Sequence, residues 1–228
     1  MSELQEAAEV RNHWWPREGW HPGRLVYTWH LTFEHAPELH RLVERYQATL
    51  SGLQGLDPVP TQWLHLTIQG VAFADELTQS QIDEIVTAVT LELETVPAFQ
   101  LTFGKTAIIG EAIVLPPTPA EPVHEVWRAI RSGIANVLGR EKVPTAHEQS
   151  TGFRPHVSIA YVNTSGPAAI YREALEAMGQ VDPASASVTD VALIVQDRVL
   201  APEWVYRWTT AATVRLGGSM QQECPGTG

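Results

Sequence analysis

Trp63-Leu64-His65-Leu66-Thr67-Ile68-Gln69 and Arg154-Pro155-His156-Val157-Ser158-Ile159-Ala160 are the two stretches that decide the fold of this 228-residue chain. Each alternates apolar and polar residues, which predicts a β-strand with one buried face. Successive side chains of a strand point to opposite faces, so His65, Thr67 and Gln69 are expected on one face of the first strand. The same argument puts His156 and Ser158 together on the second.

An imidazole beside a hydroxyl, supplied twice, offers a general acid, a general base and two neutral hydrogen-bond donors for one anionic group. This inventory suits phosphodiester chemistry without a metal ion. A third triplet, His30-Leu31-Thr32, shows that the pattern needs support from its context. For one triplet alone, a half-buried strand histidine bonded to a neighbour is the ordinary interpretation. The pair 91 positions apart (156 − 65) favours two similar lobes that share one active site.

These motifs resemble those of the 2H phosphoesterase superfamily, specifically its bacterial 2′-5′ RNA ligase-like (LigT-like) branch, whose hallmark is two H-x-[ST] motifs. Pro155 before His156 and the order of the intervening segments extend the resemblance over about residues 24–216. The resemblance implies an α+β fold with two pseudo-symmetric lobes of antiparallel sheet and outer helices around a central cleft. One departure is Tyr161, which stands where relatives often carry Arg, and Arg154 and Lys105 are candidates for the missing cation.

The resemblance also implies an activity. It predicts a metal-independent phosphodiesterase that opens a 2′,3′-cyclic phosphate, on a nucleotide or an RNA end, to a 2′-phosphate, with 2′-5′ ligation as the reverse reaction. His65 and His156 are the predicted catalytic residues, one accepting a proton from water and the other protonating the leaving ribose oxygen. Thr67 and Ser158 are the predicted phosphate-binding residues. The symmetric motifs do not say which histidine is the base.

No cofactor is expected, because the chain contains no nucleotide-cofactor or paired-cysteine motif. Metal is not expected either, since neither triplet carries a carboxylate or a further histidine nearby on its face. The alternative function is a non-catalytic nucleotide- or partner-binding module that keeps the cleft. Tyr161 in place of Arg and the acidic composition favour that alternative.

The formal charge of −11, with only two lysines, disfavours binding of long nucleic acid. The expected partner is a small nucleotide, a cyclic phosphate or a short RNA end, with no membrane and no obligate protein partner. The amino terminus lacks the features of a signal peptide, and Cys224 has no partner for an internal disulfide. We therefore expect a cytoplasmic monomer.

The chain divides into a Trp-rich segment at 1–23 expected to pack on the body, the bilobal domain at 24–216 and a flexible tail at 217–228. The Trp-rich segment is either a lid or base-stacking wall beside the cleft, or a hydrophobic strap over the core. A strand at 25–33 puts His30 on a polar face, as a substrate contact, a partner of the catalytic residues or a structural histidine. The expected auxiliary substrate-binding residues are His30, Gln69, Arg154 and Tyr161.

The remaining pattern predicts helices at 36–51, 78–94, 122–138 and 168–178. It predicts further strands at 99–103, 112–115, 188–196 and 204–216, a turn at 57–60 and a strand-ending proline run at 116–119.

Overall fold

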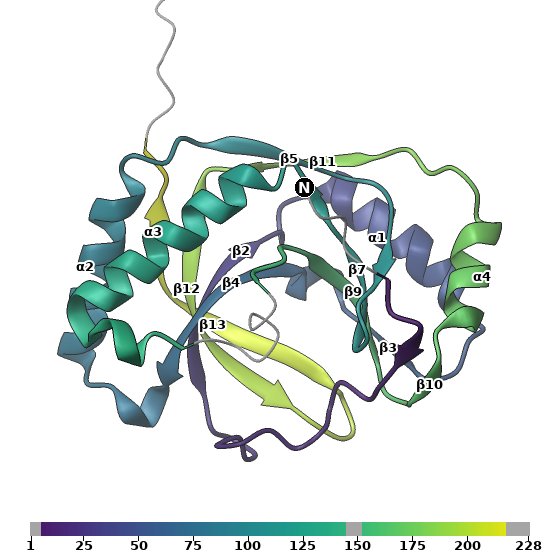
Figure 1. Cartoon of the computed structure of the whole chain (residues 1–228), viewed down its shortest axis with the longest axis horizontal. Helices are drawn as coiled ribbons and strands as arrows, with labels where there is room; N and C mark the ends of the chain where they lie inside the picture. The colour runs from purple at the N-terminus through teal and green to yellow at the C-terminus, as the bar shows by residue number, and fades with distance from the viewer. Residues whose placement is uncertain (1–5, 145–151, 218–228) are drawn as a thin grey trace, which may run out of the picture.

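Two four-stranded antiparallel sheets form the centre of the molecule (Figure 1). The computed structural model describes residues 6–144 and 152–217. The first sheet has the order β13-β12-β2-β4, with bounds Val205–Arg215, Asp190–Val199, Val26–Thr32 and His65–Phe73. The second has the order β3-β9-β7-β6, with bounds Leu56–Pro58, Val157–Val162, Ala112–Leu115 and Ala107–Ile108. Each sheet therefore contains one of the two motif strands.

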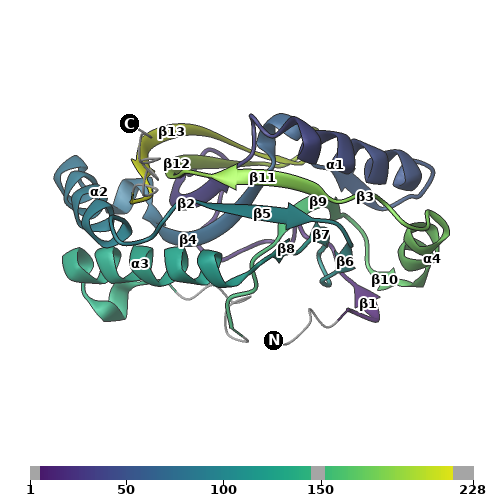
Figure 2. The same ribbon diagram turned by 90° about the horizontal axis from the view of Figure 1, so that it is seen from above.

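Smaller pairings connect these sheets. A three-stranded sheet has the order β11-β5-β8, with bounds Ala184–Val188, Phe99–Phe103 and Pro117–Thr118. Its strands β5 and β11 lie at the top of the view in Figure 1 and cross the middle of the view in Figure 2. Near the amino terminus, β1 (Glu9–Val10) pairs with β10 (Gly166–Pro167).

The helices lie in two pairs on the outside of the molecule (Figures 1 and 2). Helices α2 (Gln79–Leu93) and α3 (Glu121–Leu138) pack together beside the first sheet, and α1 (Pro37–Leu50) and α4 (Ala169–Ala177) lie beside the second. Thr78 and Gln81 form a capping box that starts α2, and Pro37 starts α1. None of the described helices is long and apolar enough to cross a membrane.

The apolar sides of the motif strands form part of the core. Leu64, Leu66 and Ile68 of the first motif and Val157 and Ile159 of the second have no exposed surface. Fully burying one such side chain stabilises the fold by roughly 1.5–3 kcal/mol. The apolar half of each alternating motif thus holds its strand in place, and the mixed α+β architecture predicted from the sequence is confirmed.

All four predicted helices are present, but some strands differ from expectation. The strands at 99–103 and 112–115 belong to different sheets, because β5 pairs with β11 and β8 whereas β7 pairs with β9 and β6. The proline run ends β7, yet Pro117–Thr118 pairs with β5 as β8. The turn predicted at 57–60 overlaps β3, where Pro58 is tolerated because the strand lies at a sheet edge. The strand predicted at 188–196 is divided between β11 and β12.

Both motif strands contain a β-bulge just past the hydroxyl residue. In β4, Thr67 pairs with His30 and Gln69 pairs with Trp29, so Ile68 is an extra residue. In β9, Ser158 pairs with Val114 and Ala160 pairs with Ile113, so Ile159 is an extra residue. One extra residue reverses which side chains face each side of the sheet beyond that point. The face shared by His65 and Thr67 therefore continues at Gly70 rather than at Gln69.

The contact between α2 and α3 generates a stability prediction. A Cβ atom added at Gly133 of α3 would lie 2.8 Å from the Cα atom of Val89 in α2, too close for the two helices to keep their spacing. We expect Gly133→Val to lower the free energy of unfolding by roughly 1–3 kcal/mol through overpacking. Urea denaturation measures this change. Gly52→Val is the control, because a Cβ atom there meets nothing within 4 Å; equal effects of the two substitutions would contradict the packing account.

Candidate active site

A cleft of about 720 Å³ lies between the two main sheets. Its volume falls within the range of small-molecule sites. The cleft is lined from β4 and β2 on one side, from β9 and the turn before β7 on the other, and from the amino-terminal segment. Of the predicted site residues, six line it: His65, Thr67, Arg154, His156, Ser158 and Tyr161. The fold thus brings the two motifs to one site.

The two catalytic candidates are oriented in the same way. The Nδ1 atom of His65 lies 2.8 Å from the carbonyl oxygen of Trp63, and Nδ1 of His156 lies 2.7 Å from the carbonyl oxygen of Arg154. A carbonyl oxygen only accepts, so Nδ1 is the donor in both rings. Each neutral imidazole then carries its lone pair on Nε2. With Nδ1 protonated, Nε2 is the nitrogen that can accept a proton, as a base requires.

His65 lies in an aromatic environment that excludes water. The His30 ring stacks on it with 4.3 Å between centroids, and Trp208 packs edge-on at 5.1 Å. Burial lowers the pKa of His65 to about 4; the hydrogen bond to Trp63 opposes this, and the charges of His156 and His13 add to it. His65 is therefore neutral at pH 7, whereas His156 is only partly buried.

His30 does not line the cleft, so the direct substrate contact considered for it is not supported. The side chain has no exposed surface and lies behind the site, with its Nε2 atom 3.3 Å from the hydroxyl oxygen of Thr67. Burial lowers the pKa of His30 well below its usual value, and the charge of His65 adds to that effect. His30 is thus a neutral residue that contacts both His65 and Thr67.

Gln69 was predicted beside His65 and Thr67, and the structure corrects this. Its amide donates to the carbonyl oxygens of Gly70 and Pro144, and its side-chain oxygen accepts from Arg131 of α3. The bulge at Ile68 is the physical reason, because it moves Gln69 to the face covered by α3. Lys105 is exposed and does not line the cleft.

The fifth residue after each motif histidine faces the cleft. In the first copy this residue is Gly70 and in the second it is Tyr161, and both line the cleft. Gly70 provides no side chain, and the Tyr161 ring stacks on His13 at 4.2 Å between centroids. Neither motif strand therefore supplies a cation at this position.

The amino-terminal segment contributes cleft residues that its sequence pattern did not reveal. Residues 9–20, which we call the strap, run across the molecule between the two lobes, along the lower edge in Figure 1. The strap contributes these residues to the cleft lining: Glu9, Val10, Arg11, His13, Arg17 and Trp20. The Trp-rich composition was the available signal, but it did not identify the polar residues between the tryptophans.

Contacts with both lobes hold the strap. The backbone N–H groups of Arg11 and His13 donate to carbonyl oxygens of Gly110 and Val162 in the second lobe. The Trp14 indole donates to Asp57, while Trp20 packs against Phe73 of the first lobe. Further bonds run from Arg198 to the carbonyl oxygens of His13 and Trp15. The strap is therefore a wall of the cleft as well as a cover over the core.

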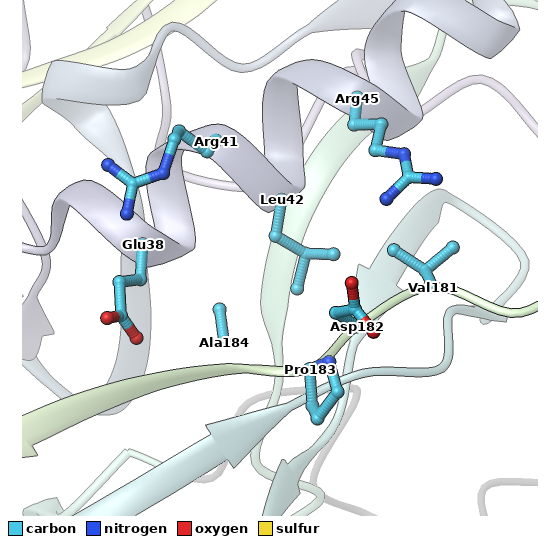
Figure 3. Close-up of a pocket in the computed structure, with 8 residues that line it drawn as sticks. All are labelled: Glu38, Arg41, Leu42, Arg45, Val181, Asp182, Pro183 and Ala184. Carbon is cyan, nitrogen blue, oxygen red and sulfur yellow. The ribbon is translucent and has the colours of Figure 1, made fainter.

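Another hollow, of about 340 Å³, lies between α1 and the segment that leads into β11 (Figure 3). Arg41, Leu42 and Arg45 project into it from α1, opposite Asp182 and neighbouring residues. Its lining contains charges of both signs but no imidazole. Within residues 6–144 and 152–217, no group of three or more His, Cys, Asp or Glu side chains could hold a metal ion. The cleft with the two motifs is the candidate active site.

Comparison with known proteins agrees with this fold. The structure is similar to TT0787 of Thermus thermophilus, with a TM-score of 0.62, 19% identity and coverage of 86% of this chain and 98% of that chain. It is also similar to E. coli LigT complexed with 3′-AMP, with a TM-score of 0.57, 15% identity and coverage of 85% and 98%. These likenesses define a LigT-like 2H phosphoesterase fold.

A family model described as the 2′-5′ RNA ligase superfamily matches residues 33–200, well over half of the chain. The chain belongs to this superfamily, which confirms the resemblance seen in its two motifs. No significant match was found among curated proteins. The matched region begins after the strap.

The burial of His65 predicts how stability depends on pH. Between about pH 6.5 and pH 4 the unfolded chain binds a proton at His65 that the folded chain does not. We expect the free energy of unfolding to fall over this window as the pH is lowered, with His65 contributing up to about 1.4 kcal/mol per pH unit. Denaturant titrations at several pH values should show a smaller slope for His65→Gln. His35→Gln, at an exposed surface position, should keep the wild-type slope, and identical slopes for all three proteins would contradict the account.

Proposed function

We propose that this protein is a phosphodiesterase that opens a 2′,3′-cyclic phosphate, on a nucleotide or a short RNA end, to a 2′-phosphate without a metal ion. One observation carries the proposal: His65 and His156 line one cleft from two different sheets, each with Nδ1 bonded to a carbonyl oxygen. Paired imidazoles of this kind provide a base and an acid in a single site. Membership of the 2′-5′ RNA ligase superfamily supports phosphoester chemistry.

The reaction would proceed by in-line attack of water on phosphorus. One imidazole takes a proton from the water at Nε2 while the new P–O bond forms. The bond between phosphorus and the ribose O3′ breaks, and the other imidazole gives its Nε2 proton to that oxygen. Thr67 and Ser158 donate hydrogen bonds to the non-bridging oxygens as charge builds up on them. With the 5′-hydroxyl of a second RNA end in place of water, the same steps would join two ends through a 2′-5′ linkage.

The unequal surroundings of the two histidines support different roles for them. His65 is buried and neutral, so it is the imidazole ready to accept the proton of water. His156 is less buried and serves, in its protonated form, as the acid. His30 supports the base by stacking on its ring and contacts the Thr67 hydroxyl that faces the substrate.

A nucleotide ligand is supported by the relatives and by the cleft. E. coli LigT, which has a similar fold, has been crystallised in complexes with 3′-AMP, ATP and NADP+. Among the residues that the structure describes, the charged side chains lining the cleft are Glu9, Arg11, Arg17, Glu111 and Arg154, three cations and two anions. Their sum of +1 contrasts with the −11 of the whole chain. The cleft is thus suited to a small anion even though the chain as a whole is acidic.

Replacing either histidine tests the proposal. We expect His65→Ala and His156→Ala each to lower kcat by about two to four orders of magnitude, because each removes one proton-transfer group. Thr67→Ala and Ser158→Ala should cost less. The assay follows hydrolysis of the four nucleoside 2′,3′-cyclic monophosphates in the presence of a chelator, with the 2′- and 3′-phosphate products resolved.

His35→Ala is the control, since its imidazole is exposed, outside the cleft lining, and should leave turnover unchanged. Near-normal kcat in His65→Ala or His156→Ala would remove that residue from catalysis. Nucleotide binding without any turnover by the wild-type protein would instead favour a binding module that keeps the cleft, an outcome consistent with Tyr161 at the cleft surface.

A further inference from the structure

Two of the three arginines that line the cleft belong to the strap. The third, Arg154, lies next to the proposed catalytic residue His156, because its carbonyl oxygen accepts the hydrogen bond from Nδ1 of His156. Arg11 and Arg17 come from residues that the family model does not match. They add positive charge to the site from outside the two motif lobes, and neither has a part in the proton transfers proposed above.

Glu111 holds these two arginines in place. Its carboxylate forms an ion pair with Arg11 at 2.6 Å, accepts hydrogen bonds from Arg17 at 3.1 Å and from the Trp15 indole at 2.9 Å, and is largely buried. Burial acts to raise the pKa of Glu111, but bonds from His13 and Trp15 and the charge of Arg17 outweigh it and give a pKa of about 2. One negative charge thus fixes two positive charges, which leaves this cluster of three side chains with a net charge of +1.

This wall lies away from the hydroxyl that contacts the reacting phosphate. Glu111 precedes Ala112, which pairs with Tyr161, three residues beyond Ser158 along β9. Because Ile159 is a bulge residue, only two steps along β7, from Val114 to Ala112, separate these positions, which corresponds to roughly 7 Å. A single phosphate bound by Ser158 and the two imidazoles is therefore displaced along the cleft from Glu111. The arginines held by Glu111 are placed for a different part of the substrate.

We propose that the strap forms a second anion subsite, in which Arg17 and Arg11 bind a phosphate group other than the one that reacts. The inference rests on the proposed function and specifies its substrate: a nucleotide that carries a second phosphate across the ribose from the cyclic one. A 5′-phosphate of a mononucleotide and the preceding phosphodiester of an RNA end share this chemistry. Arginine suits such a group because its planar N–H donors match phosphate oxygens.

The test compares matched ligands on the full chain. Calorimetry measures the dissociation constants of adenosine 2′-phosphate, of adenosine 2′,5′-bisphosphate and of a dinucleotide that ends in a 2′-phosphate. We expect the added phosphate to tighten binding by about 10- to 100-fold, the range for a charge-assisted contact. A gain with the bisphosphate alone identifies a 5′-phosphate subsite, and a gain with the dinucleotide alone identifies an RNA-end subsite.

The variants are Arg17→Gln, Arg11→Gln and the double substitution. We expect Arg17→Gln to remove most of the gain, because its side chain is less exposed than that of Arg11, 25% against 58%. The ratio of two constants within one variant cancels any general loss of folded protein. Arg207→Gln is the control, since Arg207 pairs with Glu203 at an exposed site outside the cleft and should keep the wild-type ratio.

Equal affinities of the wild-type protein for all three ligands would overturn the inference, as would a gain that survives the double substitution. Turnover of the corresponding cyclic phosphates separates this result from failure of the proposed function. Turnover without a preference for the second phosphate removes the subsite and keeps the phosphodiesterase. A binding preference without turnover keeps the subsite and removes the phosphodiesterase.

Discussion

One extra residue in each motif strand is the constraint on which the site depends. Ile68 and Ile159 pack in the core, as the alternation of each motif predicts, and the bulges there shift the alternation so that the fifth residue after each histidine faces the cleft. A regular strand would place Gln69 and Ala160 there instead. The bulges therefore set the width and chemistry of the cleft: Gly70 leaves space on one side, and Tyr161 presents an aromatic ring on the other.

The two motifs are alike in sequence but unequal in their surroundings. His65 lies between His30 and Trp208 and loses its charge through burial, whereas His156 follows an irregular segment at the cleft edge. Packing thus gives two similar triplets unequal surroundings, on which the proposed roles of base and acid rest. His30 contributes to this difference, because its buried ring stacks on His65 and its Nε2 atom contacts the Thr67 hydroxyl.

Sequence periodicity was sufficient to predict the helices and the motif strands, because apolar faces and capping residues are local signals. The meeting of His65 with His156 was predicted from the paired motifs and the family resemblance that they carry. Periodicity could not locate Gln69, since a bulge leaves no distinct pattern in Thr67-Ile68-Gln69. The sheet membership of β5 and β7 depends on partners distant in the sequence, and so does the pairing of Glu111 with Arg17. The tail predicted at 217–228 lies outside the described residues apart from Gly217, which donates to the carbonyl oxygen of Leu93.

The pH dependence of kcat/KM for a nucleoside 2′,3′-cyclic phosphate, measured for the wild type, His65→Ala and His156→Ala, tests the unequal roles most directly. The account predicts a bell-shaped wild-type profile whose acidic limb follows the lowered pKa of His65, about 4. The residual activity of His65→Ala should lose the acidic limb, and that of His156→Ala should lose the alkaline limb. The opposite pattern would exchange the base and the acid, and an unchanged bell in both variants would contradict two-histidine catalysis.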